Sequence, residues 1–279
     1  TRRSSDLSFL VELGTLDDTL ALFAALQAAP LSGVEEIIPA ARTLLIHFDP
    51  TLTQCHQLSA AIRQLDGQMQ AQRTGKVVTI PVQYTGDDLA EMAEYLGLSV
   101  EALIQRHTGS LWQVAFCGFA PGFAYLVSRE AGIQVPRRAS PRTRIPAGSV
   151  GLAGEFSGIY PHASPGGWQI IGRTTETLFA LDRQPPALLQ PGMQVQFVDV
   201  TRAPVCVPVV KPRPLQQSAS GSAVMSVISP GLQTLFQDAG RAGQSSMGIS
   251  PSGALDQAAW RRANWLVGNP GHLPALEIT

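Results

Sequence analysis

Three features of this sequence predict an α+β and mainly β protein with more than one domain. Its 279 residues exceed the length of one ordinary domain. Its 26 glycines and 21 prolines indicate many turns and much β structure. Apolar residues at helical spacing are confined to the stretches before residue 110 and after residue 255, so we expect the long middle of the chain to be built from strands.

Residues 1–75 are expected to form a small α+β domain with the order β-α-β-β-α. Alternating apolar residues mark the strands, and apolar residues at helical spacing mark the helices. In chain order the elements are a strand at 6–14, a helix at 16–29, strands at 34–40 and 42–49, and a helix at 52–68. Asp17 and Asp18 begin the first helix, and Pro30 ends it.

Residues 76–202 are expected to form a second domain. Its first elements are, in chain order, a strand at 77–84, a helix at 87–99 and a helix at 99–109 that ends at Gly109. Asp88 and Glu91 have the spacing of a capping box at the start of the first helix. From residue 111 to residue 200, short apolar runs are separated by glycine and proline, which is typical of a β-barrel or a sandwich.

Residues 203–223 are predicted to be a linker, because four prolines are followed by a stretch rich in Gln, Ser and Gly. Residues 224–279 then hold a strand, a glycine-rich loop and a helix that begins at Asp256. A core of fewer than about 60 residues is marginal. We therefore expect this last segment either to pack on another domain or to be truncated.

Composition excludes several classes of protein. The net charge of −1 gives no support for binding to nucleic acid or to an anionic membrane. The three cysteines, Cys55, Cys117 and Cys206, lie far apart and predict neither a disulfide framework nor a metal site. No run of eighteen apolar residues and no apolar signal core is present, so a cytoplasmic location is expected.

Residues 116–173 carry the strongest indication of function. They contain six arginines and two acidic residues, an excess of four positive charges in a chain whose net charge is −1. Three motifs make up this region: "FCGFAPGFAYL" at 116–126, "PRRASPRTRIPAGSVGLAG" at 136–154 and "GIYPHASPGGWQIIGRT" at 158–174. The rings of the first motif either line a binding face, because glycine allows close backbone approach, or fill the core of an irregular strand.

The other two motifs also leave alternatives open. Arg142 and Arg144 alternate and so share one side of an extended segment beside Gly148. They form either an anion site or a solvated basic edge strand, for which Arg137 and Arg138 are better suited. The turn at 164–168 holds either a small planar ligand or a core Trp. His162 is more typical of a surface or structural residue than of a base.

Sequence motifs of common hydrolases are absent. The chain has no P-loop, no H-E-x-x-H, no G-x-S-x-G and no G-x-G-x-x-G after a strand. A Ser–Lys amidase is disfavoured as well, because neither Lys76 nor Lys211 lies near a serine in a glycine-rich loop. Nucleophilic hydrolysis by this chain alone is therefore disfavoured.

The three motifs, followed by "PPALLQPGMQVQF" at 185–197, closely resemble the Kip-inhibitor family, also called allophanate hydrolase subunit 1 or the B-type subunit of 5-oxoprolinase. The resemblance covers residues 5–202. The segment from residue 225 resembles the start of allophanate hydrolase subunit 2, or the C-type subunit of 5-oxoprolinase. Together these resemblances imply an α+β domain and a cyclophilin-like β-barrel, with the start of a second β-rich domain.

The resemblance also implies partners and a reaction. The two families together resemble the carboxyltransferase part of urea carboxylase, which would require the biotin of a carrier partner. In 5-oxoprolinase they act with a third, A-type subunit in the ATP-dependent opening of 5-oxoproline, where ATP binds either this chain or the partner. A founding member instead inhibits a histidine kinase. The expected function is thus a subunit of an amide-cleaving or lactam-cleaving complex, and the alternative is a regulatory inhibitor of a sensor histidine kinase.

The family motifs imply a set of substrate-binding residues, while the catalytic residues are not identified. We expect the set to bind a small carboxylate or amide, with Arg side chains and backbone N–H groups stabilising a developing anion. In the barrel they are Phe116, Gly118, Pro121, Gly122, Phe123, Tyr125, Arg142, Arg144, Pro146, Gly148, Ser149, Tyr160, Ser164, Pro165, Gly166, Gly167 and Trp168. In the last segment they are Gln237, Asp238, Gly240 and Arg241.

Overall fold

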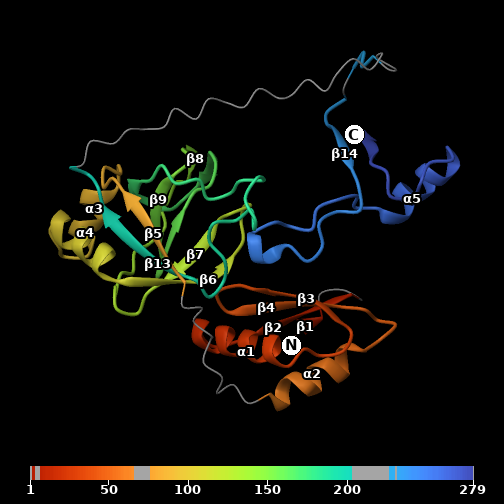
Figure 1. Ribbon diagram of the computed structural model, residues 1–279, viewed down its shortest axis with the longest axis horizontal. Coiled ribbons are helices and arrows are strands. Elements are labelled where there is room, and N and C mark those ends of the chain that lie inside the picture. Colours follow the sequence, from red (N-terminus) through yellow and green to blue (C-terminus); the bar gives the residue numbers. More distant parts are fainter. Residues whose placement is uncertain (1, 4–6, 66–75, 203–225, 230, 279) are drawn as a thin grey trace. The chain divides into compact units, whose positions relative to one another are not determined.

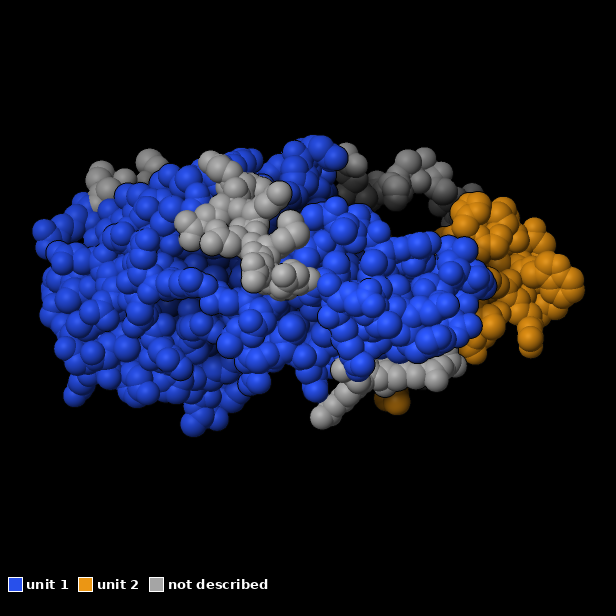
Figure 2. Space-filling model, turned by 90° about the horizontal axis from the view of Figure 1, so that it is seen from below, with its two compact units in different colours: residues 1–205, 243–250 blue, residues 206–242, 251–279 orange. Residues whose placement is uncertain are grey.

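The computed structural model describes residues 2–3, 7–65, 76–202, 226–229 and 231–278 (Figure 1). It divides into two compact units, coloured blue and orange in Figure 2. The first unit comprises residues 1–205 and 243–250, and the second comprises residues 206–242 and 251–279. The predicted linker at 203–223 and the predicted boundary at residue 75 lie outside the described residues.

The N-terminal part of the first unit is a four-stranded antiparallel sheet with two helices on one face (Figure 1). The strand order is β1-β2-β4-β3. The elements are β1 (Arg2–Arg3), β2 (Ser8–Glu12), α1 (Leu16–Ala28), β3 (Val34–Pro39), β4 (Thr43–Phe48) and α2 (Cys55–Gln64). Apart from the short β1, this is the β-α-β-β-α order that the apolar spacing predicted.

Local chemistry explains where α1 begins. The Thr15 hydroxyl accepts the N–H of Asp18 at 3.1 Å, and the Asp18 carboxylate accepts the N–H of Thr15 at 3.1 Å. This reciprocal cap satisfies two of the N–H groups that a helix start leaves unpaired. The helix then buries Leu26 against Phe9 and Ile46 of the sheet, and this apolar contact holds the layers together.

The rest of the first unit is a curled seven-stranded sheet, which confirms the predicted barrel architecture. All neighbouring strands are antiparallel except β13 and β5, which are parallel. In sheet order the strands are β12 (Gln169–Arg173), β9 (Ser149–Ala153), β10 (Phe156–Ile159), β7 (Ala124–Val127), β6 (Leu111–Cys117), β13 (Gln194–Asp199) and β5 (Val77–Val82). A separate ribbon pairs β8 (Arg142–Ile145) with β11 (Ser164–Gly166).

The sheet closes where the chain leaving β5 meets β12. Gln83 and Arg173 exchange two backbone hydrogen bonds, each 2.8 Å long. The Asp88 N–H then donates to the Ile170 carbonyl at 3.0 Å, which extends this closing seam toward the helices. A Cβ atom at Gly86 would overlap the backbone of Ile170, so only glycine fits this close approach.

Two helices cover one end of the barrel: α3 (Leu89–Tyr95) and α4 (Val100–Gly109). As predicted, α4 ends at Gly109. Its His107 is fully buried and contacts the Tyr84 hydroxyl at 2.7 Å and the Ser157 hydroxyl at 2.9 Å. Burial lowers the pKa of His107 to about 3, so the ring is neutral at physiological pH and acts as a structural core residue.

The described residues of the second unit form a two-stranded antiparallel sheet and one α-helix. β14 (Thr234–Gln237) pairs antiparallel with β15 (Ala275–Ile278), and α5 (Gln257–Leu266) begins at Asp256 as predicted. The Asp256 carboxylate accepts the N–H of Ala259 at 2.8 Å. The short 3₁₀ turn η1 (Ser245–Met247) belongs to the first unit. Within the described ranges, no helix has the length and the apolar character needed to cross a bilayer.

Gly86→Ala tests the closing seam. The added methyl group overlaps the Ile170 backbone, so we expect the free energy of unfolding to fall by about 2 kcal/mol in urea titrations. Gly109→Ala is the matched control, because an added Cβ at this position meets no atom within 4 Å. Equal stability losses in the two variants would contradict the close approach at Gly86.

Candidate functional site

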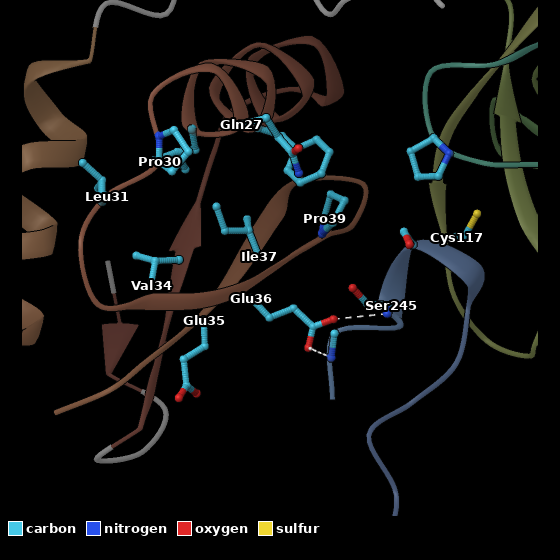
Figure 3. Close-up of a pocket in the computed structure, with 15 residues that line it drawn as sticks. Gln27, Pro30, Leu31, Val34, Glu35, Glu36, Ile37, Pro39, Cys117 and Ser245 are labelled. Atoms are coloured by element: carbon cyan, nitrogen blue, oxygen red, sulfur yellow. Dashed lines mark hydrogen bonds between the residues drawn. The ribbon is translucent and has the colours of Figure 1, made fainter. Parts of the chain in front are cut away.

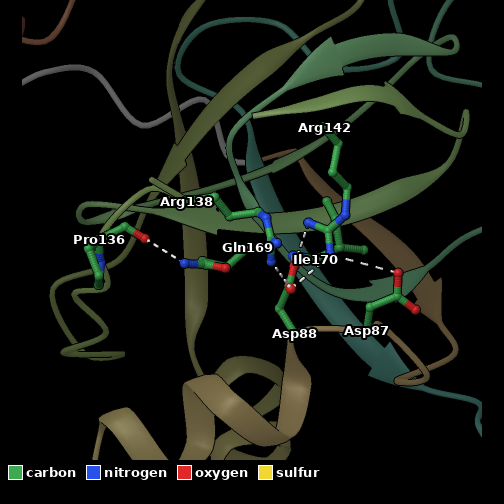
Figure 4. Close-up of polar contacts among 7 residues, drawn as sticks. All are labelled: Asp87, Asp88, Pro136, Arg138, Arg142, Gln169 and Ile170. Carbon is green, nitrogen blue, oxygen red and sulfur yellow. Dashed lines mark hydrogen bonds and ion pairs between the residues drawn. The ribbon is translucent and has the colours of Figure 1, made fainter. Parts of the chain in front are cut away.

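The Asp88 carboxylate lies at the centre of the barrel's polar cluster (Figure 4). Its Oδ1 accepts Arg138 Nη1 at 2.6 Å and Arg142 Nη2 at 2.8 Å. Its Oδ2 accepts Arg142 Nη1 at 2.8 Å and the N–H of Ile170 at 2.6 Å. The predicted capping box of Asp88 and Glu91 is wrong, because the Asp88 side chain makes no cap hydrogen bond to α3. The long-range ion pairs satisfy this carboxylate instead.

The cluster fixes the charge of Asp88, whose side chain is only 3% exposed. Burial by itself raises the pKa of Asp88. The hydrogen bonds from Arg142 and Ile170 and the charges of Arg142 and Arg138 outweigh burial and lower this pKa below its ordinary value. Arg142, which we predicted to bind an anionic ligand, therefore already has an anionic partner within the chain. Its predicted role in ligand binding stays untested.

Five aromatic rings from the first and third motifs form one cluster. The Trp168 ring lies 5.6 Å from that of Tyr125 and 5.3 Å from that of Phe123, measured between centroids. The Phe123 ring also lies 5.5 Å from Tyr160 and 5.2 Å from Phe119. Most of these pairs are edge-to-face, because the positive edge of one ring is attracted to the negative face of the next. Motifs that lie more than 30 residues apart in the sequence therefore meet in space.

Phe119 departs from the rest of this cluster. Its φ of 68° lies in the left-handed region, which costs a non-glycine residue about 1 kcal/mol or more. Its side chain is 59% exposed, whereas Phe123 and Tyr160 are buried. A strained and exposed aromatic residue next to a buried cluster is typical of a binding face rather than of a core.

The two tyrosines of the cluster are neutral at physiological pH. Burial raises the pKa of Tyr125, and burial raises that of Tyr160 to about 12. The positive charge of Arg137 opposes burial at both phenols, so the Arg137 guanidinium lies close enough to interact with both. The phenols therefore act as hydrogen-bonding groups and not as bases.

Several predicted backbone donors are engaged within the barrel. The Gly148 N–H donates to the Tyr160 carbonyl at 2.7 Å, and the Ser149 N–H donates to the Pro146 carbonyl at 3.3 Å. The Trp168 N–H bonds to the Tyr160 hydroxyl. These amides consequently need no ligand to satisfy them.

The remaining predicted residues of the second and third motifs lie at the surface or in the short ribbon. Arg144, Pro146, His162 and Pro165 are exposed, and Ser164, Gly166 and Gly167 lie in the ribbon of β8 and β11 and the turn after it.

The rest of the first motif contacts a segment from late in the chain. The Gly122 N–H donates to the Met247 carbonyl at 2.8 Å. Phe116 stacks on Tyr125 at a centroid distance of 4.5 Å. Gly118 adjoins this turn, since its carbonyl accepts the N–H of Ala120. Residues of the first motif thus make main-chain hydrogen bonds as well as contributing rings to the aromatic cluster.

A cavity of about 330 Å³ with a mixed polar and apolar lining lies elsewhere in the first unit, beside α1, β3 and residues 243–246 (Figure 3). The Glu36 carboxylate accepts the N–H groups of Ser245 at 3.1 Å and Gly243 at 3.3 Å. Cys117 borders the cavity, and burial raises the pKa of its thiol to about 12. The thiol therefore stays protonated and is not a nucleophile at neutral pH.

The predicted residues of the second unit form a local turn. Asp238 accepts the Gly240 N–H at 2.9 Å and is paired with Arg241 at 2.9 Å. Gln237 ends β14. The Arg241 guanidinium thus has an acidic partner within its own turn. Across the described residues, no group of three or more His, Cys, Asp or Glu side chains could hold a metal ion.

Two cavities of about 600 and about 640 Å³ share Tyr95, Pro136 and Arg137. We call the first of these the α3 groove. It runs from α3 to the segment Pro136–Ser140 and to Gln169 of β12. The groove adjoins the Asp88 cluster, because Arg138 belongs to both.

Sequence reasoning missed four residues of this region: Asp88 as an ion-pair partner, and Arg137, Arg138 and Gln169 as groove residues. One indication was present, because a segment with six arginines and two acids needs an acidic partner from elsewhere. The adjacent Asp87 and Asp88 were candidates for that partner. No feature of the sequence identified Gln169, since a single glutamine in an apolar strand has no recognisable pattern.

Comparison with known proteins identifies relatives of both parts of the chain. The family model described as carboxyltransferase domain, subdomain C and D, matches residues 1–189. The model described as carboxyltransferase domain, subdomain A and B, matches residues 247–279. These matches agree with the two resemblances found in the sequence.

Individual relatives support the same division. The chain is 40% identical over 156 residues to the B-type subunit of 5-oxoprolinase from Haemophilus influenzae, covering 55% of this chain and 70% of that protein. It is 52% identical over 56 residues to the C-type subunit of 5-oxoprolinase from Escherichia coli K12, covering 20% of this chain and 18% of that protein. The crystal structure of TTHA0988 matches with a TM-score of 0.74 and 36% identity, covering 96% of this chain and 55% of that chain. This chain thus spans about half the length of TTHA0988.

Asp88→Asn tests the polar cluster. Loss of the carboxylate leaves two guanidinium groups without their buried partner, so we expect the free energy of unfolding at pH 7 to fall by about 3 kcal/mol. Asp87→Asn is the control, because Asp87 is 84% exposed and lies 3.7 Å from Arg142; its loss should cost at most about 0.5 kcal/mol.

The pH dependence follows from the lowered pKa of Asp88. A lowered carboxyl pKa stabilises the fold above the unfolded-state value of about 3.9, and that stability is lost as the pH falls through the folded-state value. The stability difference between the native chain and Asp88→Asn should therefore be constant near neutral pH and shrink below about pH 4. A difference that does not change between pH 7 and pH 2 would show that the Asp88 charge does not stabilise the fold.

Proposed function

The chain belongs to the family of carboxyltransferase domains that comprise subdomains C and D, and from this premise we propose that it is a subunit of an ATP-dependent complex that cleaves an amide or a lactam. The observation that carries this proposal is the 40% identity to the B-type subunit of 5-oxoprolinase over 70% of that protein. A small carboxylate-bearing lactam such as 5-oxoproline is the proposed substrate.

The first unit supports a binding role rather than a nucleophilic one. His107 is neutral and enclosed, and the Cys117 thiol is protonated, so neither is suited to attack a carbonyl. The barrel instead offers neutral phenols, an exposed Phe119 and the guanidinium of Arg137 beside a groove. These groups can orient a small planar anion.

Opening an unstrained lactam requires activation of the amide. Transfer of the γ-phosphoryl group of ATP to the amide oxygen releases ADP and makes the carbonyl carbon electrophilic. Water then adds to this carbon, the C–N bond breaks to free the amine, and phosphate leaves. We propose that ATP binds a partner corresponding to the A-type subunit of 5-oxoprolinase. This chain then holds the substrate, while its segment resembling the C-type subunit helps to complete the complex. The cytoplasm is the proposed location. Dependence on a biotin carrier would instead favour chemistry of the urea-carboxylase type.

Reconstitution tests this function directly. The purified chain is mixed with the A-type and C-type subunits of a 5-oxoprolinase, and glutamate formation from 5-oxoproline is measured with and without ATP. We expect ATP-dependent glutamate formation that requires this chain. Omission of the chain and replacement of ATP by a non-hydrolysable analogue are the controls.

Two outcomes would overturn the proposal. Glutamate formation that is independent of this chain removes its role in the complex. Inhibition of the autophosphorylation of a sensor histidine kinase, without any lactam turnover, would make the chain a regulatory inhibitor.

A further inference from the structure

The α3 groove contains two buried polar atoms that lack partners. Gln169 is only 4% exposed, and its Nε2 donates to the Pro136 carbonyl at 3.0 Å. This bond fixes the orientation of the side-chain amide, so the other atom is the oxygen. Among the residues that the structure describes, neither Gln169 Oε1 nor Arg138 Nε has a hydrogen-bond partner.

Such atoms are unusual in folded proteins. Leaving a buried donor or acceptor unpaired costs about 1 to 3 kcal/mol, so most are satisfied. Here one is an acceptor and the other is a donor, and both belong to residues that line the same groove. A ligand group that carries both an N–H and a C=O can supply a partner for each atom. An amide held in the cis geometry of a lactam is such a group.

We propose that the α3 groove recognises the planar amide of the substrate. Gln169 Oε1 accepts the ligand N–H, and Arg138 Nε donates to the ligand carbonyl. This inference rests on the proposed function and assigns the residues that would give it specificity. Arg138 is already held by Asp88 through Nη1, so its guanidinium is oriented before a ligand arrives. Pre-organisation of this kind reduces the entropy lost on binding.

Arg137 supplies the second point of recognition. Its side chain is exposed and lines both cavities, as does Tyr95. A guanidinium in this position can bind the ligand carboxylate in a bidentate manner. Glu91 and Glu94 also line the groove, and their charges disfavour a polyanion such as a nucleoside triphosphate. In this proposal Arg137 pairs with the single carboxylate of the ligand, and the two glutamates limit the negative charge that the groove accepts.

Access to the two atoms requires a movement of the groove wall. Both atoms are covered, and the residues from Arg137 to Pro141 that form the wall have no regular secondary structure. This segment is held by the Arg138 N–H, which donates to the Gly167 carbonyl at 2.8 Å, and by the ion pair with Asp88. We infer that the segment shifts on binding while the ion pair stays in place.

Four ligands that differ in one group each test the proposed contacts one at a time. Binding to the full chain, without ATP or partners, is measured by titration calorimetry with 5-oxoproline, its N-methyl derivative, cyclopentanecarboxylate and 2-pyrrolidinone. The second lacks the N–H, the third lacks the amide and the fourth lacks the carboxylate. We expect 5-oxoproline to bind at least about tenfold more tightly than each of the others.

Variants assign each preference to a residue. Gln169→Leu should abolish the preference for 5-oxoproline over its N-methyl derivative, and Arg137→Gln should abolish the preference over 2-pyrrolidinone. Arg106→Gln, an exposed arginine on α4, is the control and should change neither ratio. Because the readout is a ratio of two affinities in one variant, a general loss of affinity or stability does not imitate it.

The proposal is overturned if 5-oxoproline does not bind, if the N-methyl derivative binds equally well, or if Gln169→Leu keeps the native preference. Turnover in the reconstituted complex together with an unchanged preference in Gln169→Leu would leave the proposed function intact and move the binding site elsewhere. Absence of both binding and turnover would remove the function as well.

Discussion

The buried carboxylate of Asp88 is the interaction on which the polar face of the barrel depends. It links the segment that follows β5 to β12, because it accepts the Ile170 N–H where the sheet closes. It also holds Arg138 and Arg142, which come from the middle of the chain. One charged group therefore reinforces the seam that Gln83 and Arg173 close, and it also holds two guanidinium groups in position.

This arrangement has a consequence for function. The guanidinium of Arg142 is occupied by Asp88, whereas Arg137 is exposed beside the α3 groove and Arg138 keeps its Nε unpaired. The positive charge that is left to bind a ligand is thus that of Arg137, which lines the α3 groove. The two arginines paired with Asp88 are held in place before any ligand arrives, and this pre-organisation supports the proposed selectivity for a small planar ligand.

Local rules predicted much of the fold, since helix starts and strand alternation are encoded within a few residues. The spans of α1 and α4 and the β character after residue 110 follow from such rules. The capping box at Asp88 failed because a contact across 54 residues, with Arg142, competes for the same carboxylate. Tyr125 and Trp168 belong to the one substrate-binding set that the family motifs imply, and their rings do meet. The partners of Arg138 and Gln169 depend on strand packing that no local spacing reveals.

The exchange rate of the Ile170 amide hydrogen, measured by NMR on the full chain, tests the central role of Asp88 most directly. If the carboxylate closes the sheet, this amide exchanges only through unfolding of the whole barrel and is as protected as the amides of β9 and β10. Exchange as fast as that of a solvent-exposed loop amide would contradict the account, because the seam would then open while the rest of the barrel stays folded.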